Sequence, residues 1–336
     1  MNPWEKIQGP GTLKSIEEEA FSKASSEAKK IPYSKSEIYT AKRRESRRIS
    51  TLHRVLVKHL KRCYQIGRIY LKAHKFYREI ISLYYPEEAI IENTRRVRGL
   101  IKVLDELKKE FLHKIELSND PRDMSRIRKE ALGRMISVIK RRSDLIQFFA
   151  KILIFAKKLP SINDETPLIV VAGPPNVGKS SLVRLISTAK PEVAEYPFTT
   201  KMISLGHFYI DDITVQIMDT PGLLDRPMEE RNEIEKQAIL ALKYVSNLVI
   251  FMFDPSPNRY YPIERQKRIL EDIMRNFRGI FVIRVVNKID ISDINIDNYF
   301  ENDVLRISVL TGEGIDKLKT KIEEYIKTWL KRRILD

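Results

Sequence analysis

The segment GPPNVGKSS, at residues 173–181, follows directly after the apolar run of residues 167–172. An apolar run of this length is typical of a buried strand, and the spacing G-x-x-x-x-G-K-S is that of a loop that wraps phosphates at the start of a helix. Gly173 and Gly178 would let backbone N–H groups converge on phosphate oxygens. Lys179 would reach the β- and γ-phosphates, and the Ser180 hydroxyl would coordinate Mg²⁺. The sequence therefore predicts a nucleoside triphosphate site that uses the whole loop: Gly173, Pro174, Pro175, Asn176, Val177, Gly178, Lys179, Ser180 and Ser181.

A second motif, Asn287-Lys288-Ile289-Asp290, ends another apolar run and indicates which base is bound. The Asp290 carboxylate can accept hydrogen bonds from guanine N1–H and from the exocyclic amine, which adenine lacks. Asn287 can reach the O6/N7 edge of the base, and the aliphatic part of Lys288 can cover the ring. The motif therefore favours GTP and GDP over adenine nucleotides.

Three further loops complete the predicted site. Asp219-Thr220-Pro221-Gly222 follows an apolar run, so we expect Asp219 to hold Mg²⁺ through water and the Gly222 N–H to contact the γ-phosphate. In the segment YPFTT, at residues 196–200, a threonine would give its hydroxyl to Mg²⁺, and Thr200 is favoured over Thr199. The backbone N–H groups of Ser308, Val309 and Leu310 would close over the base. The expected catalytic residues include Lys179, Thr200 and Gly222, and the expected metal ligands are Ser180, Thr200 and Asp219.

Residues 1–160 show the spacing of three and four between apolar residues that is typical of amphipathic helices. This spacing predicts helices over about residues 36–84, 88–117 and 122–158. The buried stripe of the first would be Ile49, Leu52, Leu56, Leu60, Cys63, Ile66 and Tyr70, and that of the second Leu100, Val103, Leu104, Leu107 and Phe111. Residues 160–164 are typical of a linker, and short apolar runs alternate with helical ones beyond them. We therefore predict an α plus α/β protein, with a basic helical bundle over residues 1–160 and a mostly parallel, doubly wound, six-stranded P-loop domain over residues 161–336.

The net charge of +16 is concentrated in the helical half. Residues 1–160 hold 37 Lys and Arg against 19 Asp and Glu, whereas the rest of the chain holds 24 against 26. Such a domain suits phosphate backbones, because binding releases counterions from the nucleic acid, and an anionic membrane surface is the competing explanation. The strongest candidates for contact with RNA are Lys42, Arg43, Arg44, Arg47, Arg48, Arg54, Lys58, Lys61 and Arg62.

Two compositional features bear on the location of the protein. Residues 1–20 contain no apolar signal core, and the longest apolar stretch, around Val245 to Phe253, is far too short to span a membrane. Cys63 is the only cysteine, so the chain can form neither an internal disulfide nor a cysteine-rich zinc site. We therefore expect a cytoplasmic protein without a membrane partner, and the sequence leaves the oligomeric state open.

The order of the motifs resembles that of the translation-factor-related GTPases, and NVGKSS, YPFTT and DTPGLLD look like the Obg branch of that class. A further resemblance, to the nucleolar GTP-binding protein family, is carried by ALGRMISVIKRR at 131–142, LPSIN at 159–163, GHF at 205–207 and LLDRPMEERNEIEKQAILAL at 223–242. That family is known for assembly of the large ribosomal subunit. The resemblance therefore implies a switch protein that binds ribosomal or pre-ribosomal RNA and large-subunit particles. One feature departs from the family pattern, since Val309 stands where alanine is usual. We also expect a short form of the family, without the long C-terminal extension of the eukaryotic members.

Leu223 stands where many GTPases have a glutamine that orients the attacking water. Hydrolysis is therefore expected to be slow until a ribosomal particle or a bound cation supplies the missing assistance. The resemblance implies a role for Asn176 in the second route, since the loop asparagine of Obg-like GTPases can hold K⁺ near the phosphates, and the plain alternative is an ordinary turn residue. The alternative function is a targeting GTPase whose basic helical domain docks on an anionic membrane or on an acidic protein.

Overall fold

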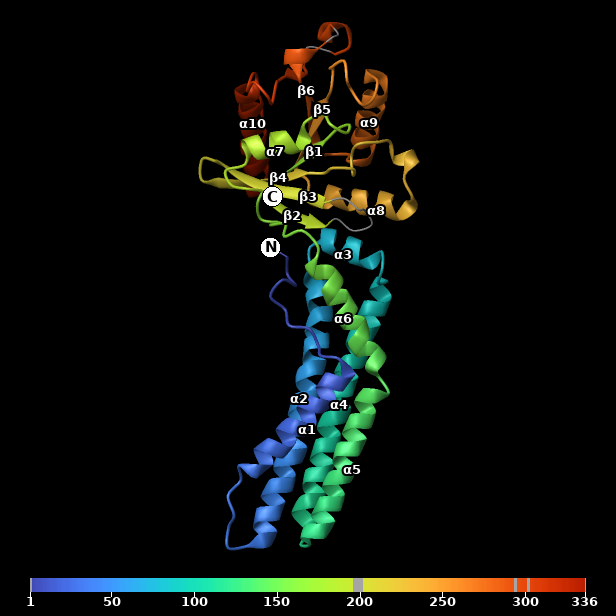
Figure 1. The fold of residues 1–336 in the computed structure, drawn as a ribbon, viewed down its shortest axis with the longest axis vertical. Helices are drawn as coiled ribbons and strands as arrows, with labels where there is room; N and C mark the ends of the chain where they lie inside the picture. Colours follow the sequence, from blue (N-terminus) through green and yellow to red (C-terminus); the bar gives the residue numbers. More distant parts are fainter. Residues whose placement is uncertain (1, 196–201, 293–294, 301–302, 336) are drawn as a thin grey trace. The chain divides into compact units, whose positions relative to one another are not determined.

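The computed structural model describes residues 2–195, 202–292, 295–300 and 303–335 (Figure 1). The chain forms two compact units. One unit, here called the helical unit, comprises residues 3–73 and 84–157. The other, here called the sheet unit, comprises residues 74–83 and the chain from residue 158 onward, together with Asn2.

The helical unit is built from long helices whose ends are capped by polar side chains. Thr12, Ser36 and Asp120 accept hydrogen bonds from backbone N–H groups in the first turns of three of them, which satisfies donors that a helix leaves unpaired. The stripe predicted for the first long helix is confirmed, because all seven of its residues are 0% exposed. Within the described residues the helices of this unit are α1 (Leu13–Lys29), α2 (Glu37–Lys72), α4 (Glu87–Leu117), α5 (Pro121–Lys140) and α6 (Ser143–Lys157).

The helix boundaries differ from the prediction in several places. α1 is absent from the prediction, because three of its four buried residues are alanines and large apolar residues do not mark its inner face. α2 ends at Lys72, since Ala73 is extended with ψ 152° and His74 then caps a separate helix, α3 (Lys75–Ser82). The run predicted at residues 122–158 is divided after Lys140 into α5 and α6. On α4, Val103 is 41% exposed, so the predicted stripe is wrong at that position.

The sheet unit contains seven strands among the described residues, in the order β2-β3-β4-β1-β5-β6-β7. β1 pairs in parallel with β4 and β5, and β6 and β7 continue the parallel part, whereas β3 is antiparallel to both β2 and β4. The predicted fold class is confirmed. The expected count of six strands is wrong, because the short edge strand β2 follows Lys190-Pro191 without an apolar run to mark it. The strands are β1 (Leu168–Ala172), β2 (Glu192–Glu195), β3 (Met202–Ile210), β4 (Ile213–Asp219), β5 (Leu248–Phe253), β6 (Phe281–Val286) and β7 (Leu305–Arg306).

Helices cover both faces of the sheet. α7 (Lys179–Ile186) and α10 (Ile315–Leu335) share one apolar core with inward side chains of β1, β4 and β5. α9 (Ile263–Asn276) contacts β5 and lies on the other side of the strands from α10 (Figure 1), and α8 (Glu233–Ala241) follows β4. β1 is buried at every position in the middle of the sheet, so the loop at its carboxyl end opens where open parallel sheets bind ligands.

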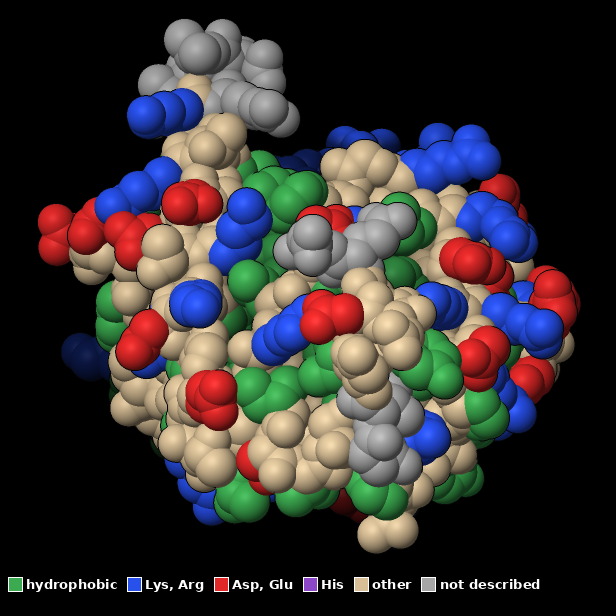
Figure 2. Space-filling model, turned by 90° about the horizontal axis from the view of Figure 1, so that it is seen from above, with side chains coloured by type: hydrophobic (Ala, Val, Ile, Leu, Met, Phe, Trp, Pro, Cys, Tyr) green, Lys and Arg blue, Asp and Glu red, His purple; other side chains and the backbone are tan. Residues whose placement is uncertain are grey.

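The charge of the sheet unit is mixed rather than one-sided. The end of the molecule seen in Figure 2 carries Lys and Arg side chains interspersed with Asp and Glu. This agrees with the nearly balanced composition after residue 160, with 24 basic against 26 acidic residues. The excess of positive charge therefore belongs to the helical half of the chain.

α3 packs within the sheet unit although its neighbours in sequence belong to the helical unit. The Tyr77 hydroxyl donates a hydrogen bond to the Pro160 carbonyl at 2.9 Å and accepts one from the Ile162 N–H at 3.1 Å. Pro160 and Ile162 are buried, so this part of the predicted linker is packed into the sheet unit. The division at residue 160 stays a prediction about functional domains, and the compact units differ from it by α3, by Asn2 and by residues 158–160.

Candidate functional site

The loop after β1 has the backbone that its two glycines allow. Gly173 has φ +139°, and a Cβ there would lie 2.4 Å from the Met252 carbonyl oxygen. Gly178 has φ +103°, and a Cβ there would lie 2.6 Å from Asn287 Nδ2. Both positions therefore require glycine, and Gly178 forms the N-cap of α7, whose positive end faces the loop. This is the geometry of a phosphate-binding loop at a helix N-terminus.

Lys179 is held against this loop. Lys179 is only 6% exposed, and its Nζ donates hydrogen bonds to the carbonyls of Gly173 and Pro174, each at 2.8 Å. Burial lowers the pKa of the Lys179 ammonium group, and the charge of Asp219 opposes that shift. An anionic phosphate would favour the charged form of this lysine in the same place.

The predicted metal ligands Ser180 and Asp219 lie together. The Ser180 hydroxyl donates to Asp219 Oδ2, and Asp219 is 1% exposed at the end of β4. Burial raises the pKa of the Asp219 carboxyl, and its Oδ1 is buried with no hydrogen-bond partner in the described part of the chain. A hydroxyl beside an incompletely satisfied carboxylate fits Mg²⁺, which prefers oxygen ligands and retains water. The other predicted ligand, Thr200, and its alternative Thr199 lie outside the described residues.

The base-selecting motif is tied to the phosphate loop by Asn287. Asn287 is 3% exposed, its Nδ2 donates to the Val177 carbonyl at 2.7 Å, and its Oδ1 accepts from the Val309 N–H at 3.0 Å. Asn287 Nδ2 carries a second N–H that these bonds do not use, so the expectation that this side chain reaches the O6/N7 edge of the base stays a prediction. The Val309 N–H is likewise engaged rather than turned to the base. In this structure Asn287 positions the loops around the nucleotide site.

The remaining residues of the base site differ in exposure. Lys288 has φ +60°, and its Nζ pairs with the buried Asp254 carboxylate at 2.6 Å. Asp290 lies exposed in a short 3₁₀ turn, where its carboxylate is accessible to a ligand. Ser308 is fully buried and its Oγ accepts from the Thr311 N–H, whereas Leu310 is 88% exposed. Contact between these residues and guanine stays a prediction.

The loop after Asp219 is fastened by an arginine that the sequence prediction did not include. Gly222 has φ +74°, and the adjacent Leu223 is 0% exposed, so its side chain packs in the interior. The Arg231 side chain, 1% exposed, donates to the Gly222 carbonyl at 3.2 Å and to Asp225 Oδ1 at 3.1 Å. Burial lowers the pKa of this guanidinium group, and the charge of Asp225 opposes the shift.

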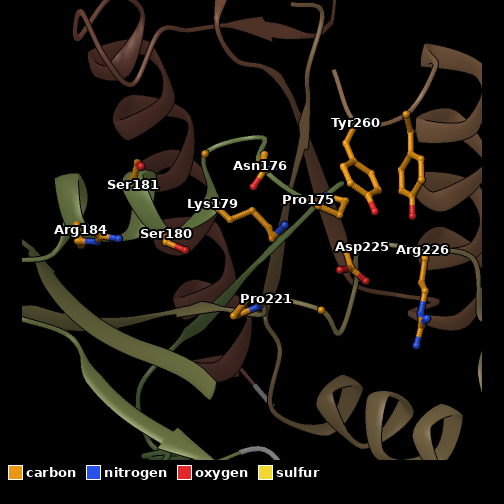
Figure 3. A pocket seen from close by; sticks show the side chains of 13 residues that line it. Pro175, Asn176, Lys179, Ser180, Ser181, Arg184, Pro221, Asp225, Arg226 and Tyr260 are labelled. Atoms are coloured by element: carbon orange, nitrogen blue, oxygen red, sulfur yellow. The ribbon is translucent and has the colours of Figure 1, made fainter. Parts of the chain in front are cut away.

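The loops after β1 and β4 line a shared cavity of about 720 Å³ (Figure 3). Seven predicted residues line it: Pro175, Asn176, Gly178, Lys179, Ser180, Ser181 and Gly222. Six further residues were not predicted: Arg184, Pro221, Asp225, Arg226, Tyr260 and Tyr261. The two tyrosines follow β5, whose carboxyl end lies beside that of β1, so the parallel pairing of these strands could have indicated them.

A phosphate loop, a Ser–Asp pair suited to Mg²⁺ and an attached Asn-Lys-x-Asp turn, on one edge of a doubly wound sheet, define a P-loop GTPase. Residues 168–288 match the family described as 50S ribosome-binding GTPase, and residues 4–163 match the NOG1 N-terminal helical domain. The chain belongs to the nucleolar GTP-binding protein family, as the resemblance predicts. Membership of the Obg branch stays a prediction.

The chain is similar to several individual proteins. An uncharacterized protein of Methanocaldococcus jannaschii is 36% identical over 74% of this chain and 69% of its own length. Nucleolar GTP-binding protein 1 of Caenorhabditis elegans is 30% identical over 74% of this chain and 38% of its own length. A crystal structure of a nucleolar GTP-binding protein 1 from Plasmodium falciparum is 33% identical and covers 53% of this chain and 94% of that one, with a TM-score of 0.45. The matches span 33% of the Drosophila melanogaster relative and 47% of the Encephalitozoon cuniculi relative.

The expected cytoplasmic location is wrong. The relatives from Caenorhabditis elegans, Drosophila melanogaster and Saccharomyces cerevisiae are all named nucleolar GTP-binding proteins, which points to the nucleolus, while the Methanocaldococcus jannaschii relative is archaeal. Within the described residues, no helix combines the length and the apolar character needed to cross a bilayer.

Proposed function

We propose that this chain is a Mg²⁺-dependent switch that binds and hydrolyses GTP, and whose helical unit binds ribosomal RNA or pre-ribosomal particles during assembly of the large subunit. The family assignment and the geometry of the phosphate loop support the nucleotide part. One observation on the helical unit carries the RNA part: a groove lined by cationic side chains.

The groove lies between α2 and α4 and has a volume of about 650 Å³. Its cationic lining residues are Arg47, Arg54, Lys58, Lys61, Arg62 and Lys108. Arg47, Arg54 and Lys61 follow one another at seven-residue spacing on one face of α2, which aligns their charges along the groove. A row of cations along a groove suits the regularly spaced phosphates of a nucleic acid backbone.

Arg47, Arg54 and Lys61 differ in their partners from other cations predicted to bind RNA on the same helix. Within the described part of the chain, Arg47, Arg54 and Lys61 form no ion pair. By contrast, Arg44 donates to the Ile31 carbonyl at 2.9 Å, and Arg48 pairs with Glu45. Arg47, Arg54 and Lys61 can therefore bind phosphate without breaking an ion pair.

Two other polar residues of the groove limit its charge. His53 Nε2 lies 2.8 Å from Asp105 Oδ1. Burial lowers the pKa of the His53 imidazole, so this residue adds no positive charge at neutral pH. The lysines and arginines therefore supply the binding charge at pH 7.

The salt dependence of RNA binding by the full chain tests this proposal. Each lost contact with a phosphate reduces the magnitude of the slope of log affinity against log salt by about 0.7 for single strands. Reversing Arg47, Arg54 and Lys61 to glutamate should therefore reduce the slope for ribosomal RNA by about 2 or more. The matched control reverses three exposed cations of the sheet unit, Arg268, Lys317 and Lys319, which changes the net charge equally and should leave the slope nearly unchanged.

Binding measurements on the same protein distinguish the RNA proposal from the alternative function. Binding to vesicles of phosphatidylserine and phosphatidylcholine, but not to ribosomal RNA, would contradict the RNA proposal and favour the targeting GTPase. A salt-independent association with an acidic protein would contradict it in the same way. Binding to RNA that weakens equally in both charge-reversed variants would contradict the groove as its site.

We also propose that hydrolysis is slow until K⁺ or a ribosomal particle assists it, and that Asn176 holds the K⁺. Asn176 has φ +61° and lines the cavity beside Lys179 (Figure 3), which supports the assignment. Exchanging KCl for NaCl at equal ionic strength should slow hydrolysis, and Asn176→Ala should remove the difference while GTP still binds. Equal rates in both salts would contradict the cation route and leave activation by a particle.

A further inference from the structure

The wall of the cavity opposite the phosphate loop contains a carboxylate that could act on water. Leu223, at the position where glutamine orients water in many GTPases, is apolar and 0% exposed. Among the described residues that line the cavity, Asp225 is the only carboxylate. Figure 3 shows Asp225 and Lys179 at the same cavity, with Tyr260 above them and Pro221 below.

The Asp225 side chain is held at this wall by the buried Arg231. Asp225 Oδ1 accepts from Arg231 Nη2 at 3.1 Å, and its side chain is 15% exposed. The same guanidinium group donates to the Gly222 carbonyl at 3.2 Å and to the Arg226 carbonyl at 3.4 Å. One buried group therefore fixes both ends of the segment from Gly222 to Arg226, with Asp225 between them.

The other Asp225 oxygen has a different environment. No hydrogen bond to Oδ2 is formed within the described residues. Asp225 lies close enough to Lys179 that its charge favours the charged form of the lysine, second only to Asp219 among acidic groups. Asp225 therefore lines the same cavity as Lys179, the residue that would reach the β- and γ-phosphates.

We infer that Asp225 is a catalytic residue that orients the attacking water through Oδ2, and that Arg231 is the positioning residue that holds Asp225. This inference rests on the proposed GTP hydrolysis. The water oxygen forms a bond to Pγ, and the bond between Pγ and the β–γ bridging oxygen breaks. Its electron pair stays on the β-phosphate of GDP, and the water proton passes to an oxygen of the released phosphate.

Asp225→Asn tests the catalytic role, because the amide oxygen can still accept from Arg231 but the side chain has no negative charge. We expect its single-turnover rate at saturating Mg·GTP to fall about 100-fold, with the affinity for a non-hydrolysable GTP analogue changed less than about twofold. Affinity for GDP with aluminium fluoride, which mimics the transferring phosphoryl group with water in line, should fall together with the rate. Glu229→Gln is the control, since Glu229 is exposed in the short 3₁₀ turn that follows Arg226 and does not line the cavity, and its rate should match the unmodified protein.

Arg231→Lys tests the positioning role, because the shorter cation cannot hold Gly222, Asp225 and Arg226 together. Its rate should fall while analogue binding persists, and the double variant with Asp225→Asn should lose little more than the slower single variant. A full rate in Asp225→Asn would overturn the inference, as would an equal loss of affinity for the analogue and for the aluminium fluoride complex. If Arg231→Lys does not fold, Asp225→Asn alone decides. Absence of hydrolysis by the unmodified protein, in K⁺ and with ribosomal particles, would overturn the proposed function as well.

Discussion

Replacing Asn287 with alanine should loosen the sheet unit at the point where three loops meet. The side chain donates to the Val177 carbonyl at 2.7 Å and accepts from the Val309 N–H at 3.0 Å. Asn287 itself is 3% exposed, so water cannot readily replace either bond. Alanine would leave one buried acceptor and one partly buried donor unsatisfied.

The size of the effect follows from these two bonds. An unsatisfied buried polar group costs about 1–3 kcal/mol, so losing both partners should lower the free energy of unfolding by about 2–4 kcal/mol when one end is partly accessible. Every 1.4 kcal/mol is a factor of ten, so this range corresponds to about 30- to 700-fold faster exchange under conditions where the exchange rate is proportional to the opening equilibrium. The effect should be largest without nucleotide, because a bound ligand stabilises the native form.

Amide hydrogen exchange of β1 measures this free energy in the full chain, since these buried amides exchange when the sheet opens. Asn298→Ala is the matched control, because Asn298 is an exposed asparagine of the same unit and its removal should change exchange by less than about threefold. Unchanged β1 exchange in Asn287→Ala, or an equal acceleration in Asn298→Ala, would refute the assignment of Asn287 as the residue that joins the loops.

Four other substitutions test separate parts of the account. Asp290→Asn should weaken GTP binding and permit xanthine nucleotide binding, because an amide can donate where the carboxylate accepts, and unchanged GTP affinity in a competition assay would contradict the assignment. Lys179→Ala and Ser180→Ala should each abolish tight Mg·GTP binding while the far-ultraviolet circular dichroism of the helices is retained, and retained binding in both would contradict the phosphate-loop assignment. Glu19 has its pKa lowered from 4.5 to about 2 by hydrogen bonds from Lys23 and His59, so its contribution to stability is full above pH 4.5 and is lost as the pH falls toward 2. Glu19→Gln should flatten the pH dependence of unfolding of the helical unit in that interval, and an unchanged slope in urea titrations would contradict the role of this carboxylate.

The parts of the site that could be predicted from sequence are those whose chemistry fixes local spacing. The phosphate loop needs glycines at Gly173 and Gly178, and the structure shows backbone or side-chain atoms where their Cβ atoms would lie. Ser180 and Asp219 lie far apart in sequence, yet Ser180 follows β1 and Asp219 ends β4, and these two strands pair in parallel, so their meeting follows from topology. Such residues are visible because strand, loop and residue type occur together.

The parts that could not be predicted depend on contacts through space. Asn287 reads as a base-binding residue, and only the fold shows that its amide also links the Val177 carbonyl to the Val309 N–H. Arg231 lies in a charged stretch that resembles a solvated surface. Its side chain is nevertheless 1% exposed, and it donates hydrogen bonds to Asp225 and to two backbone carbonyls. A pattern of residue types does not distinguish such buried polar partners from exposed ones.

The same limit explains the differences in the fold. α1 packs mainly through alanines, so a pattern based on the spacing of large apolar side chains does not detect this helix. α3 continues the apolar pattern of α2, so the break at Ala73 and the transfer of this short helix to the sheet unit depend on tertiary packing around Tyr77. Helix type was therefore predictable here, whereas helix boundaries and unit membership were not.

Co-sedimentation with isolated large ribosomal subunits tests the central claim most directly. The full chain should pellet with the particles in Mg²⁺ and a non-hydrolysable GTP analogue and should be released in GDP. The variant with Arg47, Arg54 and Lys61 reversed to glutamate should fail to pellet although it still binds the analogue. Equal pelleting in the triphosphate, diphosphate and nucleotide-free states, or no pelleting in any of them, would contradict a GTP-controlled switch that acts on the large subunit.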